Sequence, residues 1–359
     1  MSRVSREQIL DALRRVQDPE LNKDLVTLDM IKNIDVRDGR VRLGIELTTP
    51  ACPLKEQIGA DVERELRKLD GVSQVDIDWT ARVRPNAAGP AGLPGVKNAI
   101  AIGAGKGGVG KSTIALLTAV GLAREGAAVG LMDADVYGPS IPKMLGVESA
   151  KPFVQDDQII PIEAAGIKVM SMGFMVEADK AIIWRGPMVH GVVKQFLEQV
   201  AWGELDYLII DLPPGTGDVP LTLAQSLPMT GAVVVCTPQA VALLDATKAL
   251  RMYQQLNVDI LGIVENMSYF RAPDTGHEYD LFGRGGARQA AERLDVPFLG
   301  EIPINVDIRI SGDAGTPAAN FERTDSATRD AIQSYVKTLA GRVSIRNAAA
   351  TPALKLNIT

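Results

Sequence analysis

A glycine-rich segment between an apolar strand and a helix constrains this chain more than any other feature. Residues 105–112 read Gly-Lys-Gly-Gly-Val-Gly-Lys-Ser and match the pattern Gly-x-x-x-x-Gly-Lys-Ser. The apolar residues 99–102 precede it and a helical run, residues 114–122, follows it. Glycines let backbone N–H groups turn toward an anion, and the positive end of the next helix adds to the attraction. A structural turn alone leaves Lys111 and Ser112 unexplained, so we predict a phosphate-binding loop.

Each polar residue of this loop has an expected role. Lys111 should reach the terminal phosphates of a nucleotide, and the hydroxyl of Ser112 should ligate Mg²⁺. Catalytic roles are expected for Lys111, Lys106 and Asp135. The residues expected to contact the nucleotide are Gly105, Lys106, Gly107, Gly108, Val109, Gly110, Lys111, Ser112 and Thr113.

Apolar runs of strand length alternate with helix-length segments over most of the chain. Nearly continuous apolar strands are typical of a parallel sheet covered on both faces. Residues 97–341 are therefore predicted to form a doubly wound α/β P-loop NTPase domain with a mostly parallel sheet. The runs are residues 99–102, 129–132, 207–210, 232–235, 260–264 and 298–302.

A small α/β domain is predicted at residues 1–84, before the P-loop domain. Ser5 and Gln8 form the pattern of a capping box, and the periodicities that follow indicate helix, strand, strand, helix and strand. Residues 85–96 are rich in Pro, Gly and Ala and are expected to be a linker. Residues 342–359 are Ala-rich and weakly patterned, and we assign them no structure.

Charge and cysteine content exclude several classes of partner. The 38 Lys and Arg against 44 Asp and Glu give a net charge of -6 without a basic cluster, so nucleic acid is not expected. No apolar run approaches the ~20 residues that a bilayer requires, and we expect a cytoplasmic protein without a membrane partner. The two cysteines, Cys52 and Cys236, are too far apart in sequence for a Cys-x-x-Cys metal site.

Acidic residues follow two of the predicted strands. Asp133 and Asp135 come after residues 129–132, and Asp211 comes directly after residues 207–210. Ligands of open α/β sheets bind at the carboxyl edge of the strands. We therefore expect Asp211 and Asp133 to hold Mg²⁺ through water and Asp135 to orient the attacking water. A helix cap or a local turn is the alternative for any one of these aspartates.

The nucleotide is predicted to be ATP. No Asn-Lys-x-Asp motif for reading guanine follows the later strands. Asn266 follows residues 260–264, where its side chain is expected to read the amino edge of adenine.

Lys106 makes the loop resemble one particular group. Residues 105–113, Gly-Lys-Gly-Gly-Val-Gly-Lys-Ser-Thr, resemble the deviant P-loop of the MinD, ParA and nitrogenase-reductase group. In that group the extra lysine reaches across a dimer to the partner's nucleotide. The resemblance implies a homodimer in which Lys106 supplies charge in trans for hydrolysis. A solvated loop lysine is the alternative.

Within that group the chain looks most similar to the Mrp/ApbC family of iron–sulfur cluster carrier ATPases. This likeness implies a cluster, [4Fe–4S] by analogy, that is obtained with scaffold proteins and passed to apo iron–sulfur proteins under the control of ATP. Residues 48–53, Thr-Thr-Pro-Ala-Cys-Pro, resemble the small iron–sulfur-assembly domain that members often carry. The segments that carry the likeness are residues 133–140, 184–188, 211–218, 265–268 and 282–286.

The cysteines depart from the family pattern. Members commonly bear Cys-Pro-x-Cys-Gly after the Asn-Met-Ser segment, whereas residues 272–276 here are Ala-Pro-Asp-Thr-Gly. Cys52 becomes the candidate ligand, near a helix N-terminus where the dipole would favour the thiolate, with a small buried hydrophobe as the alternative. Cys236 is predicted to be a buried apolar residue. The histidines, His190 and His277, are expected on the surface.

Two other functions use the same kind of loop. A positioning ATPase of the MinD or ParA kind should carry a basic amphipathic helix or a basic face, and residues 342–359 contain Pro352 and no such helix. The second alternative is a non-catalytic assembly scaffold in which ATP only locks the dimer.

Overall fold

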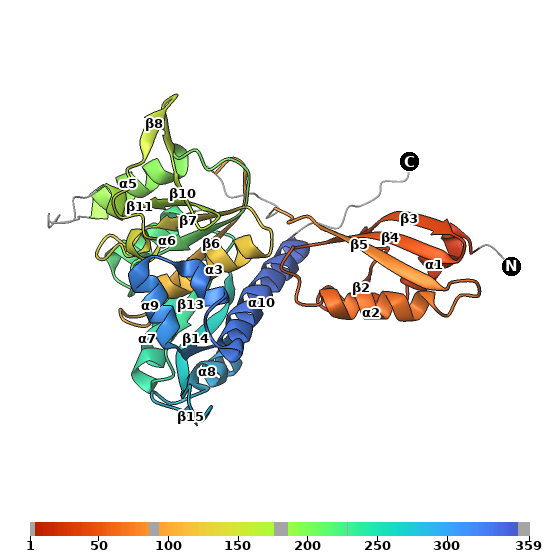
Figure 1. Ribbon diagram of the computed structural model, residues 1–359. Coiled ribbons are helices and arrows are strands. Elements are labelled where there is room, and N and C mark those ends of the chain that lie inside the picture. The colour runs from red at the N-terminus through yellow and green to blue at the C-terminus, as the bar shows by residue number, and fades with distance from the viewer. Residues whose placement is uncertain (1–3, 86–92, 176–185, 228, 351–359) are drawn as a thin grey trace. The chain divides into compact units, whose positions relative to one another are not determined.

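The structure is a computed structural model that describes residues 4–85, 93–175, 186–227 and 229–350 (Figure 1). The chain divides into two compact units, which are described separately. One consists of the residues up to Arg84 together with those from Ala340 onward, and the other is Pro85–Leu339.

The first unit is a three-stranded sheet with two helices on one face. Its sheet has the order β3-β4-β5, with β3 and β4 antiparallel and β4 and β5 parallel. Two short strands add to the predicted order of helix, strand, strand, helix and strand. The elements are α1 (Arg6–Leu13), β1 (Gln17–Asp18), β2 (Lys23–Asp24), β3 (Ile31–Arg37), β4 (Arg40–Leu47), α2 (Lys55–Leu66) and β5 (Gln74–Ala81).

Buried and exposed side chains alternate along the strands of this unit, and this pattern explains how the sheet packs against the helices. Val41, Leu43 and Ile45 of β4 are fully buried against α1 and α2. Arg40 and Arg42 point to the opposite, solvent-exposed face. The predicted capping box begins α1 as expected: the Gln8 N–H donates to Ser5 Oγ at 3.2 Å and the Ser5 N–H donates to Gln8 Oε1 at 2.9 Å.

The second unit contains a nine-stranded sheet that is mostly parallel, as predicted. Its order is β10-β11-β7-β12-β6-β13-β14-β15, with β16 paired to β14, and only the pairs β10–β11 and β14–β15 are antiparallel. A separate hairpin joins β8 (Phe153–Gln155) and β9 (Gln158–Ile160). The strands of the large sheet are β6 (Val96–Ala104), β7 (Val129–Asp133), β10 (Ile162–Ala164), β11 (Ile167–Ser171), β12 (Leu205–Asp211), β13 (Gly231–Cys236), β14 (Ile260–Arg271), β15 (Glu278–Tyr279) and β16 (Phe298–Ile304).

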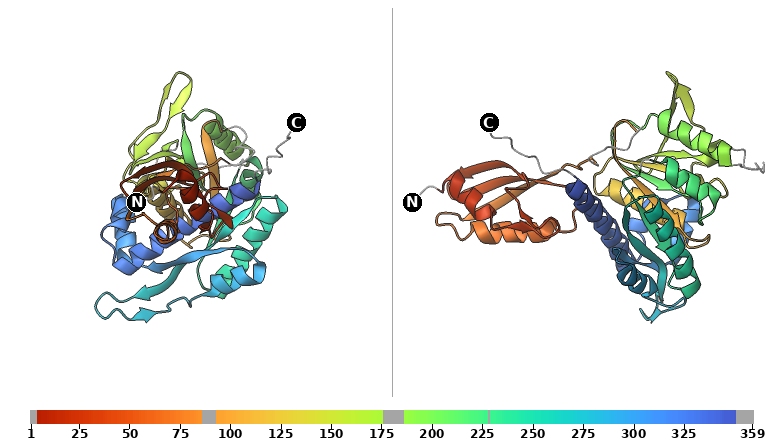
Figure 2. Two further views of the ribbon diagram at one scale, coloured as in Figure 1. Left: turned by 90° about the vertical axis from the view of Figure 1, so that its right-hand side faces the viewer. Right: turned by 180° about the vertical axis from the view of Figure 1, so that it is seen from behind.

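Helices cover both faces of this sheet (Figures 1 and 2). Ala99 and Ala101 of β6 pack with buried residues of α5, α6, α7 and α8, whereas Ile100 and Ile102 are buried on the face where α3 lies. The helices are α3 (Lys111–Arg124), α4 (Ile141–Met144), α5 (Gly186–Glu198), α6 (Asp218–Ser226), α7 (Ala240–Gln255), α8 (Gly286–Leu294), α9 (Val306–Ala314) and α10 (Ser326–Ala350), with 3-10 turns η1 (Met172–Phe174) and η2 (Pro317–Phe321).

One expectation about the chain's last residues is wrong. Residues 342–359 were assigned no structure, but α10 continues to Ala350, and residues 351–359 lie outside the described part. Val343 and Asn347, four residues apart on this helix, are both buried, and Asn347 Nδ2 donates to the carbonyl of Arg84 at 3.0 Å. Tertiary contacts therefore stabilise a helical end whose alanines hide its periodicity.

We predict that Tyr335→Phe lowers the free energy of unfolding by about 1 kcal/mol. Its hydroxyl hydrogen-bonds Thr118 Oγ1 at 2.8 Å between α3 and α10, and both residues are fully buried. Urea unfolding measures the loss. Tyr279→Phe is the matched control, because Tyr279 is exposed and should change stability by less than about 0.5 kcal/mol. Equal effects of the two substitutions would contradict the prediction.

Candidate functional site

The glycine-rich loop connects the end of β6 to the start of α3. Gly108 and Gly110 both have φ of +81°, a left-handed conformation that favours glycine, and Gly110 caps α3. A Cβ on Gly110 would lie 2.1 Å from Asn266 Nδ2, and one on Gly105 would lie 2.1 Å from the carbonyl oxygen of Asp245 in α7. Gly105 is therefore required by the close approach of the α7 backbone, and Gly110 by its left-handed conformation and the neighbouring Asn266 side chain.

The second lysine of the loop, Lys111, is paired with carboxylates. Lys111 is 6% exposed, and its Nζ lies 2.6 Å from Asp211 Oδ1, 3.3 Å from Asp135 Oδ2 and 3.2 Å from Ser112 Oγ. Asp211 ends β12, and Asp133 ends the neighbouring strand β7. The expected convergence of these residues at the carboxyl edge of the sheet is present, and their catalytic and metal-binding roles stay predictions.

More carboxyl groups meet here than one ammonium can keep ionised. Burial, and then the nearby charge of Asp211, raises the pKa of Asp133 to about 8. Burial likewise raises the pKa of Asp211, although Lys111 opposes that shift. Burial alone would lower the pKa of Lys111, but Asp211 and Asp135 together raise it. The site therefore strongly favours cations.

Asp133 is held by neighbouring donors. Its Oδ1 accepts a hydrogen bond from the Asp135 N–H at 3.1 Å, and its Oδ2 accepts one from Ser171 Oγ at 2.8 Å. Ser171 ends β11, the next strand of the sheet, and the sequence analysis did not identify it. A hydroxyl at the carboxyl end of a strand is the signal that could have indicated it.

The acidic group fits a divalent cation. Among the described residues, Asp211 Oδ2 is the buried side-chain oxygen without a hydrogen-bond partner. Ser112, partly exposed, lies beside it at the start of α3. A hard cation such as Mg²⁺ takes carboxylate and hydroxyl oxygens of this kind. Asp211 and Ser112 are the residues that would hold it, and Asp133 ends the neighbouring strand.

Asn266 braces the loop in this structure. Its Nδ2 donates to the carbonyl of Val109 at 2.8 Å, and the side chain is 5% exposed. We predicted that Asn266 follows the end of a strand, but β14 runs on to Arg271. Its expected contact with adenine stays a prediction, and the loop contact is one that sequence patterns did not indicate.

Lys106 lies partly exposed on the loop, beside α7. The backbone of Asp245 in α7 lies against Gly105, and the apolar side chains of Val241 and Leu244 on the same helix are 66% and 64% exposed. The residue before Lys106 therefore packs against a helix that carries two exposed apolar side chains.

Two families match the chain. The NUBPL iron-transfer P-loop NTPase family matches residues 95–340, and an iron–sulfur cluster assembly protein family matches residues 6–77. The chain belongs to the NUBPL iron-transfer P-loop NTPase family. The resemblance that the loop and the other segments indicated is thereby confirmed.

Relatives of this NTPase match over nearly its full length. The iron–sulfur cluster carrier protein of Deinococcus radiodurans is 50% identical over 96% of this chain and 98% of its own length. The iron–sulfur cluster carrier protein of Escherichia coli is 42% identical over 95% of this chain and 96% of its own length.

Solved structures resemble the second unit. A nucleotide-binding protein of Archaeoglobus fulgidus in complex with ADP is 45% identical, with a TM-score of 0.56 over 62% of this chain and 88% of its own. The cell division ATPase MinD of Pyrococcus furiosus is 23% identical, with a TM-score of 0.50 over 67% of this chain and 97% of its own, and supports the fold alone.

Both thiols of this NTPase are buried. Cys52 is buried in the core of the first unit, where burial and the charges of Glu20 and Asp18 raise its pKa to about 11. Burial agrees with the alternative of a small buried hydrophobe, and the role of Cys52 as a ligand stays a prediction. Cys236 is buried as predicted, and burial raises its pKa to about 12. The part of the chain that the structure describes holds no group of three His, Cys, Asp or Glu able to bind a metal.

Other residues of interest lie on the β14–β15 hairpin and on α5. Residues 272–276 belong to the hairpin between β14 and β15, and His277 is exposed there against the ring of Tyr279. His190 is exposed on α5. Trp184 and Arg185 lie outside the described residues. No helix among those described is long and apolar enough to span a bilayer.

We predict that, with a chelator present and without nucleotide, the stability of the protein falls as pH rises from about 5 to about 8. The pKa of Asp133 is raised from 3.8 to about 8, so across this window the folded state binds more protons than the unfolded state. Asp133→Asn should flatten the fall by at least about half. Urea unfolding at several pH values measures it, with the exposed Asp280→Asn as control. Stability that is constant or increasing over this range would contradict the prediction.

Proposed function

We propose that this protein is a Mg²⁺-dependent ATPase that carries iron–sulfur clusters, acts as a homodimer and delivers its cargo to apo-proteins. The observation that carries the proposal is the group formed by Lys111, Asp135 and Asp211 around the phosphate loop. It occurs in a chain that is 50% identical to a protein named iron–sulfur cluster carrier over nearly the full length of both.

In ATP hydrolysis, the buried side chains of Lys111, Asp211 and Asp135 would act in successive steps. The terminal phosphates of ATP compete with Asp211 for the ammonium of Lys111, which now lies 2.6 Å from that carboxylate. The backbone N–H groups of residues 105–110 and the start of α3 then hold the phosphates. Bound Mg²⁺ would neutralise negative charge on the phosphate oxygens. Asp135, beside Lys111 and facing the same space, would orient the attacking water.

The homodimer is supported by what surrounds Lys106. Exposed Val241 and Leu244 lie on α7, whose Asp245 backbone contacts Gly105 immediately before Lys106. An apolar surface next to a cationic loop suits an interface that forms over the nucleotide, because it excludes water from the transferred charge. In that arrangement Lys106 would act on the nucleotide of the second copy.

Binding of an iron–sulfur cluster depends on the cysteines of this chain. Four thiolates usually hold an iron–sulfur cluster, and this chain has only Cys52 and Cys236. Both are buried, and burial raises the pKa of each thiol. Cys52 would therefore have to become exposed before it could bind iron, and two copies would together supply two of the four ligands.

We predict that Lys106→Ala lowers kcat for ATP hydrolysis by at least ~100-fold, about 2.7 kcal/mol of barrier, because it removes charge that stabilises the transition state. ADP affinity should change little, whereas Lys111→Ala should lose both hydrolysis and ADP binding. Phosphate release and calorimetry measure the two quantities. Lys151→Ala, at an exposed lysine outside the site, is the control. Hydrolysis by Lys106→Ala at the parent rate would favour an ATP-locked scaffold.

We predict that anaerobic reconstitution with iron and sulfide yields a dimer with thiolate-to-iron absorption. Cys52→Ala should reduce the bound iron by at least about half, because Cys52 is the proposed ligand. Cys236→Ala is the matched control and should retain it. A parent protein that takes up no iron under these conditions would rule out the carrier function, and full iron content in Cys52→Ala would rule out this ligand.

A further inference from the structure

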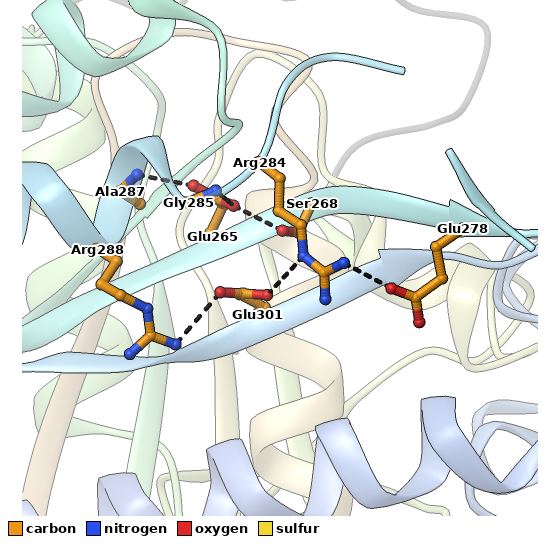
Figure 3. A network of polar contacts seen from close by, with 8 residues as sticks. All are labelled: Glu265, Ser268, Glu278, Arg284, Gly285, Ala287, Arg288 and Glu301. Atoms are coloured by element: carbon orange, nitrogen blue, oxygen red, sulfur yellow. Dashed lines mark hydrogen bonds and ion pairs between the residues drawn. The ribbon is translucent and has the colours of Figure 1, made fainter. Parts of the chain in front are cut away.

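The buried carboxylate of Glu265 connects two segments that have no role in the proposed hydrolysis (Figure 3). They are residues 265–268 and the turn before α8. Glu265 of β14 is fully buried. Its Oε1 accepts hydrogen bonds from Ser268 Oγ at 2.6 Å and from the Gly285 N–H at 2.8 Å, and its Oε2 accepts one from the Ala287 N–H at 2.7 Å. Glu265 thus joins segment 265–268 to the turn that begins α8, and it satisfies two N–H groups that the helix itself leaves free.

The next residue on the strand joins the same point to the phosphate loop. Asn266 Nδ2 donates to the carbonyl of Val109, and it fills the space where a Cβ of Gly110 would lie. Consecutive side chains of a strand point to opposite faces of the sheet. Glu265 and Asn266 therefore fasten β14 to α8 on one side and to the phosphate loop on the other.

An outer group of charges extends the connection to the next strands (Figure 3). Arg284 Nη1 lies 2.6 Å from Glu278 of β15, its Nε lies 3.2 Å from Glu301 of β16, and its guanidinium lies over the ring of Tyr269 at 4.0 Å. Arg288 of α8 lies 3.2 Å from Glu301 as well. These contacts hold the turn before α8 to the two strands of the hairpin, β14 and β15.

β14 is irregular between these anchors and the hairpin. Met267 has φ of +55°, which is uncommon for a residue with a side chain, and the pairing with β16 changes register between Asn266 and Phe270. Beyond this point the hairpin forms one wall of a cavity of about 500 Å³, whose other wall is the start of α9. The hairpin residues on it include Ala272 and Pro273. A shift of the strand at the irregular residue would change the shape of this cavity.

We propose that Glu265 is a positioning residue that couples the phosphate loop to the hairpin at residues 271–278, so that nucleotide binding changes the hairpin and the cavity beside it. The loop backbone at Val109 cannot move without moving Asn266 or breaking its bond, and Glu265 is the adjacent residue. By linkage, a partner that occupies the cavity changes nucleotide affinity in return. The inference rests on nucleotide binding by the loop, the first step of the proposed function.

Hydrogen–deuterium exchange on the full chain, with and without saturating ADP, tests this coupling. In the parent, ADP should change exchange in residues 271–279 and in residues 285–287 by about fivefold or more. Glu265→Gln keeps the shape but loses one acceptor, because its NH₂ group faces an N–H donor. In this variant the response of the hairpin should fall below about twofold while ADP still binds.

Two further variants localise the connection. Arg284→Met should lose the response in residues 271–279 and keep it in residues 285–287, because only the outer ion pairs are removed. Asn320→Ala removes a buried polar side chain of η2 that hydrogen-bonds Ser311, and it should keep the full response. It controls for a general loss of stability.

The outcomes separate the two proposals. A parent that binds ADP with unchanged exchange in the hairpin overturns the coupling and leaves the nucleotide site intact. A full response in Glu265→Gln overturns the role of Glu265. If that variant does not fold, Arg284→Met decides, since an undiminished hairpin response there also overturns the connection. A parent that does not bind ADP overturns both the coupling and the proposed function.

Discussion

The ion pair between Lys111 and Asp211 is the interaction on which the arrangement of the site depends. Both charges are buried, and a buried charge is tolerated only when a partner is in place. The partner is supplied by sheet order, because β12 lies between β6 and β7 and brings Asp211 beside the start of α3. Were the strands in another order, Lys111 would be an uncompensated ammonium inside the protein.

Much of this could be predicted because it follows from local patterns. The loop has glycines at the two positions of left-handed backbone that matter, and its strand and helix are recognisable from composition alone. Asp133 and Asp211 each end an apolar strand, and the rule that ligands bind at the carboxyl edge predicted that they meet. Neither inference required knowledge of a distant contact.

The errors share a physical cause, which is burial that only tertiary structure determines. β14 was expected to end at residue 264 because Glu265, Asn266 and Ser268 are polar, yet each is buried with a partner from another element or its own strand. For Cys52 the sequence left a ligand near a helix N-terminus and a small buried hydrophobe both open, and the structure shows burial, which raises the pKa of the thiol. Neither sequence spacing nor propensity reports how much water remains around a group.

The balance of charges at the site links nucleotide binding to cation binding. Asp135 and Asp211 contact a single ammonium, that of Lys111, and the carboxyl group of Asp133 lies near enough to influence it. When Lys111 turns toward phosphate, Asp211 loses its neutralising partner while further negative charge enters the site. Only an arriving cation, or a proton, can compensate that carboxylate in its buried position. Nucleotide and divalent cation should therefore bind together, because each removes the electrostatic obstacle that the other would face alone.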